Sequence, residues 1–172
     1  MTHAGLEGGC TTCHMQGRVR SGNTLPNHSF SMTDTTYGFK PVTVCKPCHG
    51  EIEDFNDIRA FYDFDRNGRI EGVQTEIQGL LNALKARLPL DSLTGEPVTM
   101  TKDSLKVKNR FDYVANIWNY YLVKNDASLG IHNTKYAVRL LYKALGWTPL
   151  NVKELPGMPD AFALSQNYPN PF

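Results

Sequence analysis

Four cysteines fall in two pairs of identical spacing, and they are the residues of this chain best suited to chemistry. They are Cys10, Cys13, Cys45 and Cys48, so every thiol in the 172 residues belongs to a CxxC pair. Two thiols at this spacing can hold a metal ion, form a catalytic disulfide or be alkylated by a cofactor. Structural disulfides are a poor fit, because such short loops constrain the unfolded chain little.

A histidine follows each pair directly, as His14 in CTTCH (10–14) and His49 in CKPCH (45–49). With five histidines in the chain, chance gives this arrangement only about once in 1,200. A four-cysteine zinc site has a compatible spacing but leaves both histidines without a role. A thioredoxin-like pair needs a βαβ frame, which is not visible here. Covalent haem uses every residue of the motif, since two thiols bond the vinyl groups and the imidazole binds iron. The sequence therefore predicts two haem c groups, with zinc as the alternative.

Each iron needs a second axial ligand, and three histidines remain: His3, His28 and His132. His132 precedes Asn133, a good N-cap, and a helical apolar stripe, so its imidazole is expected at a rigid helix start. His28 lies in a loop-like stretch between the two motifs, and His3 lies near the N-terminus. Methionine is the other possible type of ligand. Because three histidines compete for two positions, one is either an ordinary surface residue or a ligand to a neighbouring molecule.

Several segments resemble multihaem c-type cytochromes, including relatives of the pentahaem nitrite reductases. They are CTTCHM, NHSFSM, CKPCHG, WNYYLVKNDASLGIHN and KYAVRLLYKAL, scattered over residues 10–145. In such cytochromes a His-Ser/Thr-Phe element and a Gly-Ile/Val-His-Asn element supply distal imidazoles, so the resemblance implies that role for His28 and His132. His3 is then the surplus imidazole, available to ligate iron in trans. Neither motif is the CxxCK variant of the nitrite-reducing haem, which argues against a reductase.

The segment DFDRNGRIEGVQTE, residues 63–76, resembles an EF-hand-type calcium loop. Its D-x-D-x-N-G order places oxygens at positions 1, 3 and 5 and a glycine turn at position 6. Position 12 is Gln74 rather than glutamate, so Glu76 is expected to close the site, with Glu71 as another candidate. The alternative is a solvated acidic turn. The predicted calcium ligands are Asp63, Asp65, Asn67, the carbonyl of Arg69, and Glu76.

Apolar periodicity predicts helices at 72–88, about 103–124 and 133–145, after a mostly irregular segment 1–60. The expected fold is mainly α with much irregular loop and few or no strands, a small dihaem c-type cytochrome fold. We assign residues 1–150 to this domain and 151–172 to an extended linker, where Pro and Asn increase and periodicity ends. The middle helix is expected to bury one face: Phe111, Val114, Ala115, Trp118, Tyr121 and Leu122.

The final nine residues, LSQNYPNPF (164–172), resemble the opening of the C-terminal sorting domain of the type IX secretion system. The resemblance implies export through the periplasm to the cell surface or the medium, and covalent haem attachment also requires export. A linker that docks on a partner is the alternative. The 18 basic and 17 acidic residues nearly cancel, which argues against a nucleic-acid partner. No apolar run reaches the length of a transmembrane helix.

These features predict an extracellular electron-transfer protein rather than an enzyme, with two bis-histidine haems and one structural Ca²⁺. Its partners would be other cytochromes, an extracellular electron donor or acceptor, or copies of itself. The surplus histidine and the linker-like end suggest a sharper hypothesis, a conductive filament of stacked haems with His3 supplied in trans. The alternative function is a small haem reductase with one open iron site.

Overall fold

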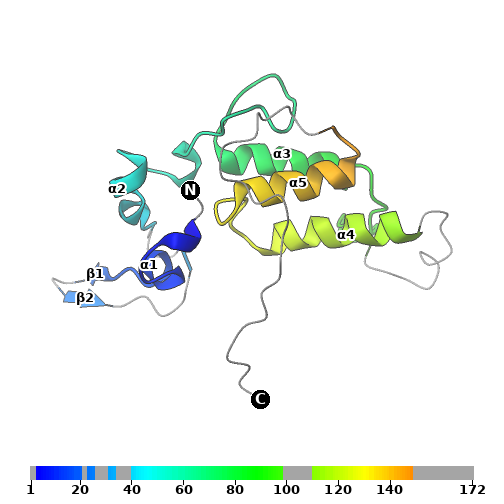
Figure 1. Ribbon diagram of the computed structural model, residues 1–172. Coiled ribbons are helices and arrows are strands. Elements are labelled where there is room, and N and C mark those ends of the chain that lie inside the picture. Colours follow the sequence, from blue (N-terminus) through cyan, green and yellow to red (C-terminus); the bar gives the residue numbers. More distant parts are fainter. Residues whose placement is uncertain (1–2, 21–22, 26–30, 34–39, 99–109, 149–172) are drawn as a thin grey trace, which may run out of the picture.

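The chain is mainly helical, with much loop, as the sequence predicts. The computed structural model describes residues 3–20, 23–25, 31–33, 40–98 and 110–148. Three helices of 12 to 16 residues dominate it: α3 (Val73–Lys85), α4 (Arg110–Asn125) and α5 (Thr134–Leu145) (Figure 1). The shorter elements are helices α1 (Cys10–His14) and α2 (Lys46–His49), the antiparallel strands β1 (Arg18–Arg20) and β2 (Asn23–Leu25), and 3₁₀ helices His3–Gly5, Val42–Val44 and Phe55–Asp57.

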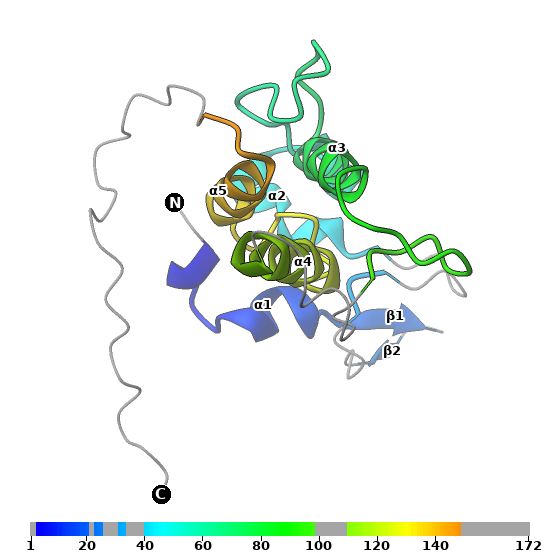
Figure 2. The ribbon, with the colours of Figure 1, turned by 90° about the vertical axis from the view of Figure 1, so that its right-hand side faces the viewer.

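Helix α3 supplies most of the fully buried core. The apolar residues predicted to share one face are all buried, and α5 packs along that helix while α4 packs on α5. Figure 2 shows the three helices nearly end-on, side by side. The periodicity of this helix therefore predicted its packing correctly, at Val73, Ile77, Leu80, Leu81, Leu84 and the nearby Leu88.

Helix α5 begins and ends where its sequence predicts. The Asn133 side chain accepts a hydrogen bond from the Tyr136 backbone N–H at 3.1 Å, as an N-cap residue should. Gly146 ends the helix in the left-handed conformation, with φ of 65°, which glycine adopts without a steric penalty. The Asn133 cap therefore fixes where the loop that contains His132 ends and α5 begins.

The face that α4 buries differs from the predicted one. Ile117, Tyr120 and Val123 point into the core, whereas Trp118 is 70% exposed and Leu122 is 41% exposed. Ala115 is also exposed, Val114 and Tyr121 are half-buried, and the side chain of Phe111 lies outside the described residues. Because α4 carries apolar residues on both sides, periodicity alone could not select the face that meets α3 and α5. The prediction for this face was wrong.

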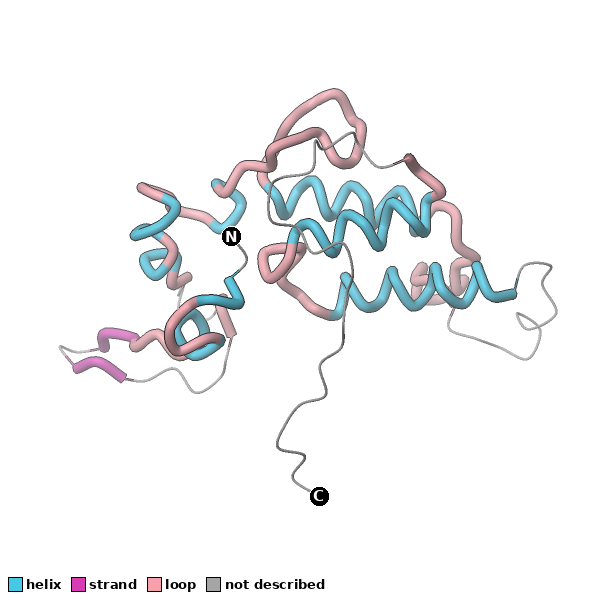
Figure 3. Tube along the Cα trace, viewed as in Figure 1, coloured by secondary structure: helices cyan, strands magenta, loops and turns pink. Residues whose placement is uncertain are grey.

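The short N-terminal elements lie beside one end of the bundle, the end that carries the start of α3 and the loop between α4 and α5 (Figures 1 and 3). They have a small core of their own, formed by Val42, Ile52 and Phe55. Ile58 packs against both this core and the main one, so it joins the two parts. The CxxCH motifs are thereby held near the loop that contains His132.

No described helix has the length and apolarity that a membrane crossing requires. The middle helix is described from Arg110 onward, so its predicted start near residue 103 lies outside the described residues. His28 and the segment 151–172 lie outside them as well.

Candidate functional site

The first CxxCH motif is a single helical turn. Residues three and four apart lie on the same side of a helix, so α1 presents Cys10, Cys13 and His14 together. The side chains of Cys13 and His14 are half-buried, and Cys10 is exposed. Two thiols and an imidazole on one side of a turn can all address one flat cofactor.

The second motif repeats this arrangement. The backbone N–H groups of Cys48 and His49 both donate to the carbonyl of Cys45, at 3.2 and 2.9 Å. Pro47 stands in the first turn of α2, where its missing N–H costs nothing. Cys45 packs against the small N-terminal core, which anchors this motif to the fold.

The four thiols are free, and burial affects the pKa of two of them, Cys13 and Cys45. Burial raises the pKa of Cys13, and the neighbouring Cys10 raises it further. Burial also raises the pKa of Cys45, with added repulsion from Cys13 and Cys48, so the two motifs lie close enough to interact.

The four thiols do not converge on a point. Within the part of the chain that the structure describes, only one group of three or more His, Cys, Asp or Glu residues has ligand atoms within 4.8 Å of one another, and that group contains no cysteine. A zinc ribbon would need all four sulfur atoms around one ion. This geometry gives no support to the zinc alternative.

Each CxxCH histidine lies opposite a second imidazole. The ring centres of His14 and His132 are 5.8 Å apart, with 49° between the ring planes. The ring centres of His49 and His3 are 6.1 Å apart, with 61° between the planes. The structure therefore brings together two histidine pairs, each containing one CxxCH histidine and one residue distant in sequence.

These separations can be compared with those of two imidazoles that bind one metal. Two imidazoles on opposite sides of one metal, with bonds of about 2.0 Å and each nitrogen about 1.1 Å from its ring centre, have ring centres roughly 6.2 Å apart. The observed 5.8 and 6.1 Å are close to that value. Two thiols and two imidazoles at each site are the residue types that a c-type haem with two histidine ligands would use.

Hydrogen bonding leaves one nitrogen of His132 suited to a metal. Its Nδ1 lies 2.8 Å from Oδ1 of Asp126, and an ionised carboxylate can only accept, so Nδ1 carries the proton. In a neutral imidazole the lone pair is then on Nε2. Burial alone would raise the pKa of Asp126, but hydrogen bonds from Ser128 and His132 outweigh it and hold that pKa below its ordinary range. A carboxylate behind a ligating imidazole is a frequent arrangement in metal sites.

His3 is oriented in the same way by a neutral group. Its Nδ1 lies 3.1 Å from the backbone carbonyl oxygen of Ile131, which also can only accept. Nε2 of His3 is therefore the lone-pair nitrogen as well. Since Ile131 directly precedes His132, a single loop orients both imidazoles that face the CxxCH histidines.

That loop is built rigidly against α3. Gln74 donates from Nε2 to the carbonyl oxygen of Ser128 at 3.2 Å. Ala127, Leu129 and Gly130 all have positive φ, which is costly for the two residues that carry side chains. Local backbone strain of this kind persists only where surrounding contacts enforce it. The loop therefore presents its imidazole from a fixed backbone.

The predicted iron ligands thus have different outcomes. The His132 ring lies 5.8 Å from that of His14, between ring centres, and its predicted role as an iron ligand stays a prediction. His3, expected to be surplus or to act in trans, lies opposite His49 within the same chain. His28 lies outside the described residues, so the structure does not test its predicted role.

The calcium-like loop gathers three of its predicted ligands. Asp63, Asp65 and Glu76 have carboxylate oxygens within 4.8 Å of one another. Burial raises the pKa of Asp65, and the nearby carboxylates of Glu76 and Asp63 raise it further. A cation among these groups would relieve that repulsion.

Glu76 is fully buried and shapes the loop through its backbone. Its Oε2 accepts from the N–H groups of Phe64 and Asp65, at 2.7 and 3.2 Å, and Oε1 accepts from Glu71 N–H at 2.8 Å. A carboxylate offers about four lone-pair positions, so these three bonds leave capacity for a cation. Gln74, which stands where an EF-hand loop has its glutamate ligand, donates to the carbonyl oxygen of Ser128.

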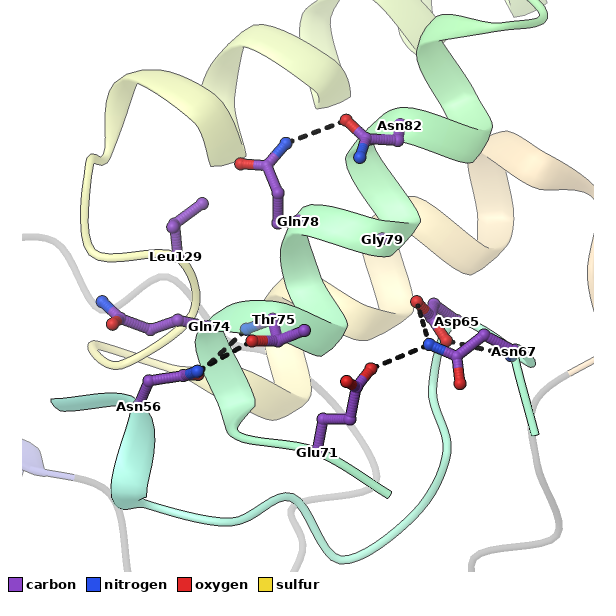
Figure 4. Close-up of a pocket in the computed structure, with 10 residues that line it drawn as sticks. All are labelled: Asn56, Asp65, Asn67, Glu71, Gln74, Thr75, Gln78, Gly79, Asn82 and Leu129. Carbon is purple, nitrogen blue, oxygen red and sulfur yellow. Dashed lines mark hydrogen bonds between the residues drawn. The ribbon is translucent and has the colours of Figure 1, made fainter. Parts of the chain in front are cut away.

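Asn67, another predicted ligand, is arranged differently. The Asn67 side-chain oxygen accepts from Arg69 N–H at 2.8 Å, and its amide nitrogen donates to Asp65 and Glu71 at 3.1 and 2.8 Å. The amide therefore bridges two carboxylates, while its oxygen faces the backbone. A polar hollow beside these residues runs along α3 (Figure 4), lined by Asn56, Asp65, Asn67, Glu71, Gln74, Thr75, Gln78, Gly79, Asn82 and Leu129.

Sequence analysis missed the residues that orient the imidazoles. Asp126 and Ser128 bond each other and His132, and Ile131 supplies the carbonyl that bonds His3. The available signal was the Asp-x-Ser turn just before GIHN, since such residues form local side-chain-to-backbone bonds. Nothing in the sequence indicated that the N-terminus folds back to this loop.

Comparison of the chain with protein-family models, with curated proteins and with solved structures gave no match.

Proposed function

We propose that this chain is an electron-transfer protein that carries two covalently attached c-type haems, each with two imidazole ligands. Cys10 and Cys13 would hold one haem, with His14 and His132 as its axial ligands. The second would be held by Cys45 and Cys48, with His49 and His3 as its axial ligands.

The pairing of imidazoles carries this proposal. Both CxxCH histidines have a second imidazole at a separation close to that of a bis-histidine metal site, and in both second imidazoles Nδ1 is occupied by a hydrogen bond. A chance contact would not require the same tautomer at both places. The histidine that follows each CxxC pair supports haem over zinc, because a four-cysteine zinc site would leave both histidines without a role.

When bound, haem supplies one-electron chemistry between ferric and ferrous iron. The residues of this chain attach the group, fix its orientation and fill both axial positions. Five residues of the two proposed sites are exposed: Cys10, Cys48, His3, His49 and His132. Both sites thus lie near the surface, which favours electron exchange with another protein or with an extracellular donor or acceptor.

The reductase alternative needs an iron with an open position. Two imidazoles per site leave none, because a substrate would have to displace a ligand. The two histidine pairs therefore favour outer-sphere electron transfer.

We place the protein outside the cell or at its surface, for the reasons given by its terminal LSQNYPNPF and its haem motifs. Other cytochromes are its expected partners. The filament hypothesis depended on His3 as the surplus imidazole. In this proposal His3 ligates iron within its own chain, which leaves His28 as the histidine without an assigned iron. Assembly of copies into a filament stays a prediction, tested by whether the haem-loaded protein elutes as a monomer or a polymer.

One structural Ca²⁺ is the second cofactor we propose. The carboxylates of Asp63, Asp65 and Glu76 would hold it. Its role would be to hold the loop that precedes α3. The same loop is bonded to α5, where the Tyr142 hydroxyl donates to the Phe64 carbonyl oxygen at 2.7 Å.

Expression with a haem-attachment system tests the proposal. A pyridine haemochrome assay should give two haems per chain, and the oxidised protein should be entirely low-spin and unreactive toward cyanide. One high-spin haem that binds cyanide would instead support the reductase. A colourless protein that retains zinc would rule out the proposal.

A further inference from the structure

We propose that Asp126 sets the two haem sites at different midpoint potentials, with the His14–His132 site the more negative. This inference rests on the proposed function and concerns how the chain distinguishes its two sites. It starts from an asymmetry between the groups that accept a hydrogen bond from the two distal imidazoles.

At the first site the acceptor is an anion. Asp126 Oδ1 accepts from His132 Nδ1 at 2.8 Å. A carboxylate behind an imidazole increases the electron-donating strength of the opposite nitrogen. Stronger donation and a nearby negative charge both stabilise ferric over ferrous iron, which lowers the potential.

At the second site the acceptor is neutral. The carbonyl oxygen of Ile131 accepts from His3 Nδ1 at 3.1 Å. A peptide carbonyl fixes the tautomer and orientation of the ring but carries no net charge. Among the residues that the structure describes, no Asp or Glu side chain is hydrogen-bonded to His3, in contrast to His132 with its partner Asp126.

Ser128 moderates the effect of Asp126. Its hydroxyl donates to Oδ2 of Asp126, and its oxygen accepts from the backbone N–H of His132 at 3.3 Å. A donor on the second carboxylate oxygen withdraws electron density from the first. Removal of the hydroxyl should therefore strengthen the hydrogen bond that His132 donates to Asp126.

The consequence is an ordered pair of sites in one small chain. His132 and the carbonyl that orients His3 are adjacent in sequence, so the same loop supports both sites with different acceptors. At equilibrium an electron shared between them resides at the His3–His49 site. Asp126 is a positioning residue here, acting through His132.

Spectroelectrochemical titration of Asp126→Asn tests this inference. The substitution should weaken the preference of one site for ferric iron about tenfold, which raises its midpoint potential by about 59 mV for a one-electron couple. The other site should stay unchanged. Asp112→Asn is the matched control, since it removes the same charge from the exposed start of α4 and should shift neither site.

Ser128→Ala provides a second arm that is expected to act in the opposite direction. It should lower the same potential that Asp126→Asn raises. The shifted site should be the one whose low-spin signal is lost in His132→Ala. If Asp126→Asn does not retain both haems, the sign of the potential shift in Ser128→Ala decides whether the inference holds.

Unchanged potentials in Asp126→Asn, or equal shifts at both sites, would overturn the inference. So would an upward shift in Ser128→Ala. These results are distinct from failure of the proposed function, which would appear in the parent protein as missing haem or a high-spin spectrum.

Discussion

Gly130 lies so close to Ile77 that a Cβ atom on the glycine would be 2.7 Å from Cγ1 of Ile77. Its φ of +85° is also one that side chains disfavour. This contact places the loop before His132 directly on the core helix α3. The position of His132, a predicted iron ligand, thus depends on a glycine at residue 130.

Gly130→Ala should destabilise the protein by about 2–4 kcal/mol, because it adds a clash to a strained φ. Gly95→Ala is the matched control, since Gly95 has φ of +66° but nothing within 4 Å of an added Cβ. That variant should lose only about 1–2 kcal/mol. Urea unfolding of the haem-loaded proteins compares them, and equal losses would contradict the close packing of the loop.

The packing of the three long helices predicts different losses of stability for a buried residue of α5 and an exposed aromatic residue of α4. Leu141 is fully buried on α5, and Leu141→Ala should cost about 2–5 kcal/mol. Trp118, 70% exposed, should tolerate Trp118→Ala within about 0.5 kcal/mol. A large loss in Trp118→Ala would mean that the originally predicted face of α4 is the buried one after all.

Glu96 predicts a pH dependence of stability. Hydrogen bonds from Lys124 and Lys85 lower its pKa from 4.5 to about 2. A carboxyl group with a lowered pKa stabilises the folded state above its ordinary pKa, and that contribution disappears as pH falls toward 2. Glu96→Gln should therefore be less stable than the parent near neutral pH, with the difference vanishing toward pH 2. Exposed Glu53→Gln should show no such trend in urea unfolding at each pH.

Calcium should raise the melting temperature of the protein relative to the protein in EGTA. At a concentration 100 times its Kd, a ligand that binds only the folded state adds about 2.7 kcal/mol. Asp65→Asn should remove this response, while Asp112→Asn, outside the loop, should retain it. An identical melting temperature with Ca²⁺ and with EGTA in the parent would contradict the proposed site.

Much of the helical framework could be predicted from local sequence. The α3 stripe, Asn133 as N-cap and Gly146 as helix end depend on neighbouring residues, and all three are confirmed. The buried face of α4 was mispredicted because both of its faces are apolar, so only the packing of α5 and α3 decides between them.

The candidate site divides in the same way. The two CxxCH turns and the D-x-D-x-N-G loop are local patterns visible in the sequence. The contact of His3 with His49, and the bond from His3 to Ile131, join residues 46 and 128 positions apart. Such contacts follow from the return of the chain to the end of the bundle, which no local pattern encodes. For this reason nothing in the sequence indicated the contact between His3 and His49, and His28 rather than His3 was predicted as a distal ligand.

The most direct test of the central claim is the electronic and magnetic spectrum of three variants, His3→Ala, His132→Ala and His28→Ala. Each of the first two should convert one of two low-spin haems to a high-spin, five-coordinate form, and a monomeric sample should show the same change. His28→Ala should leave both haems low-spin. The account would be contradicted if His3→Ala kept two low-spin haems while His28→Ala lost one.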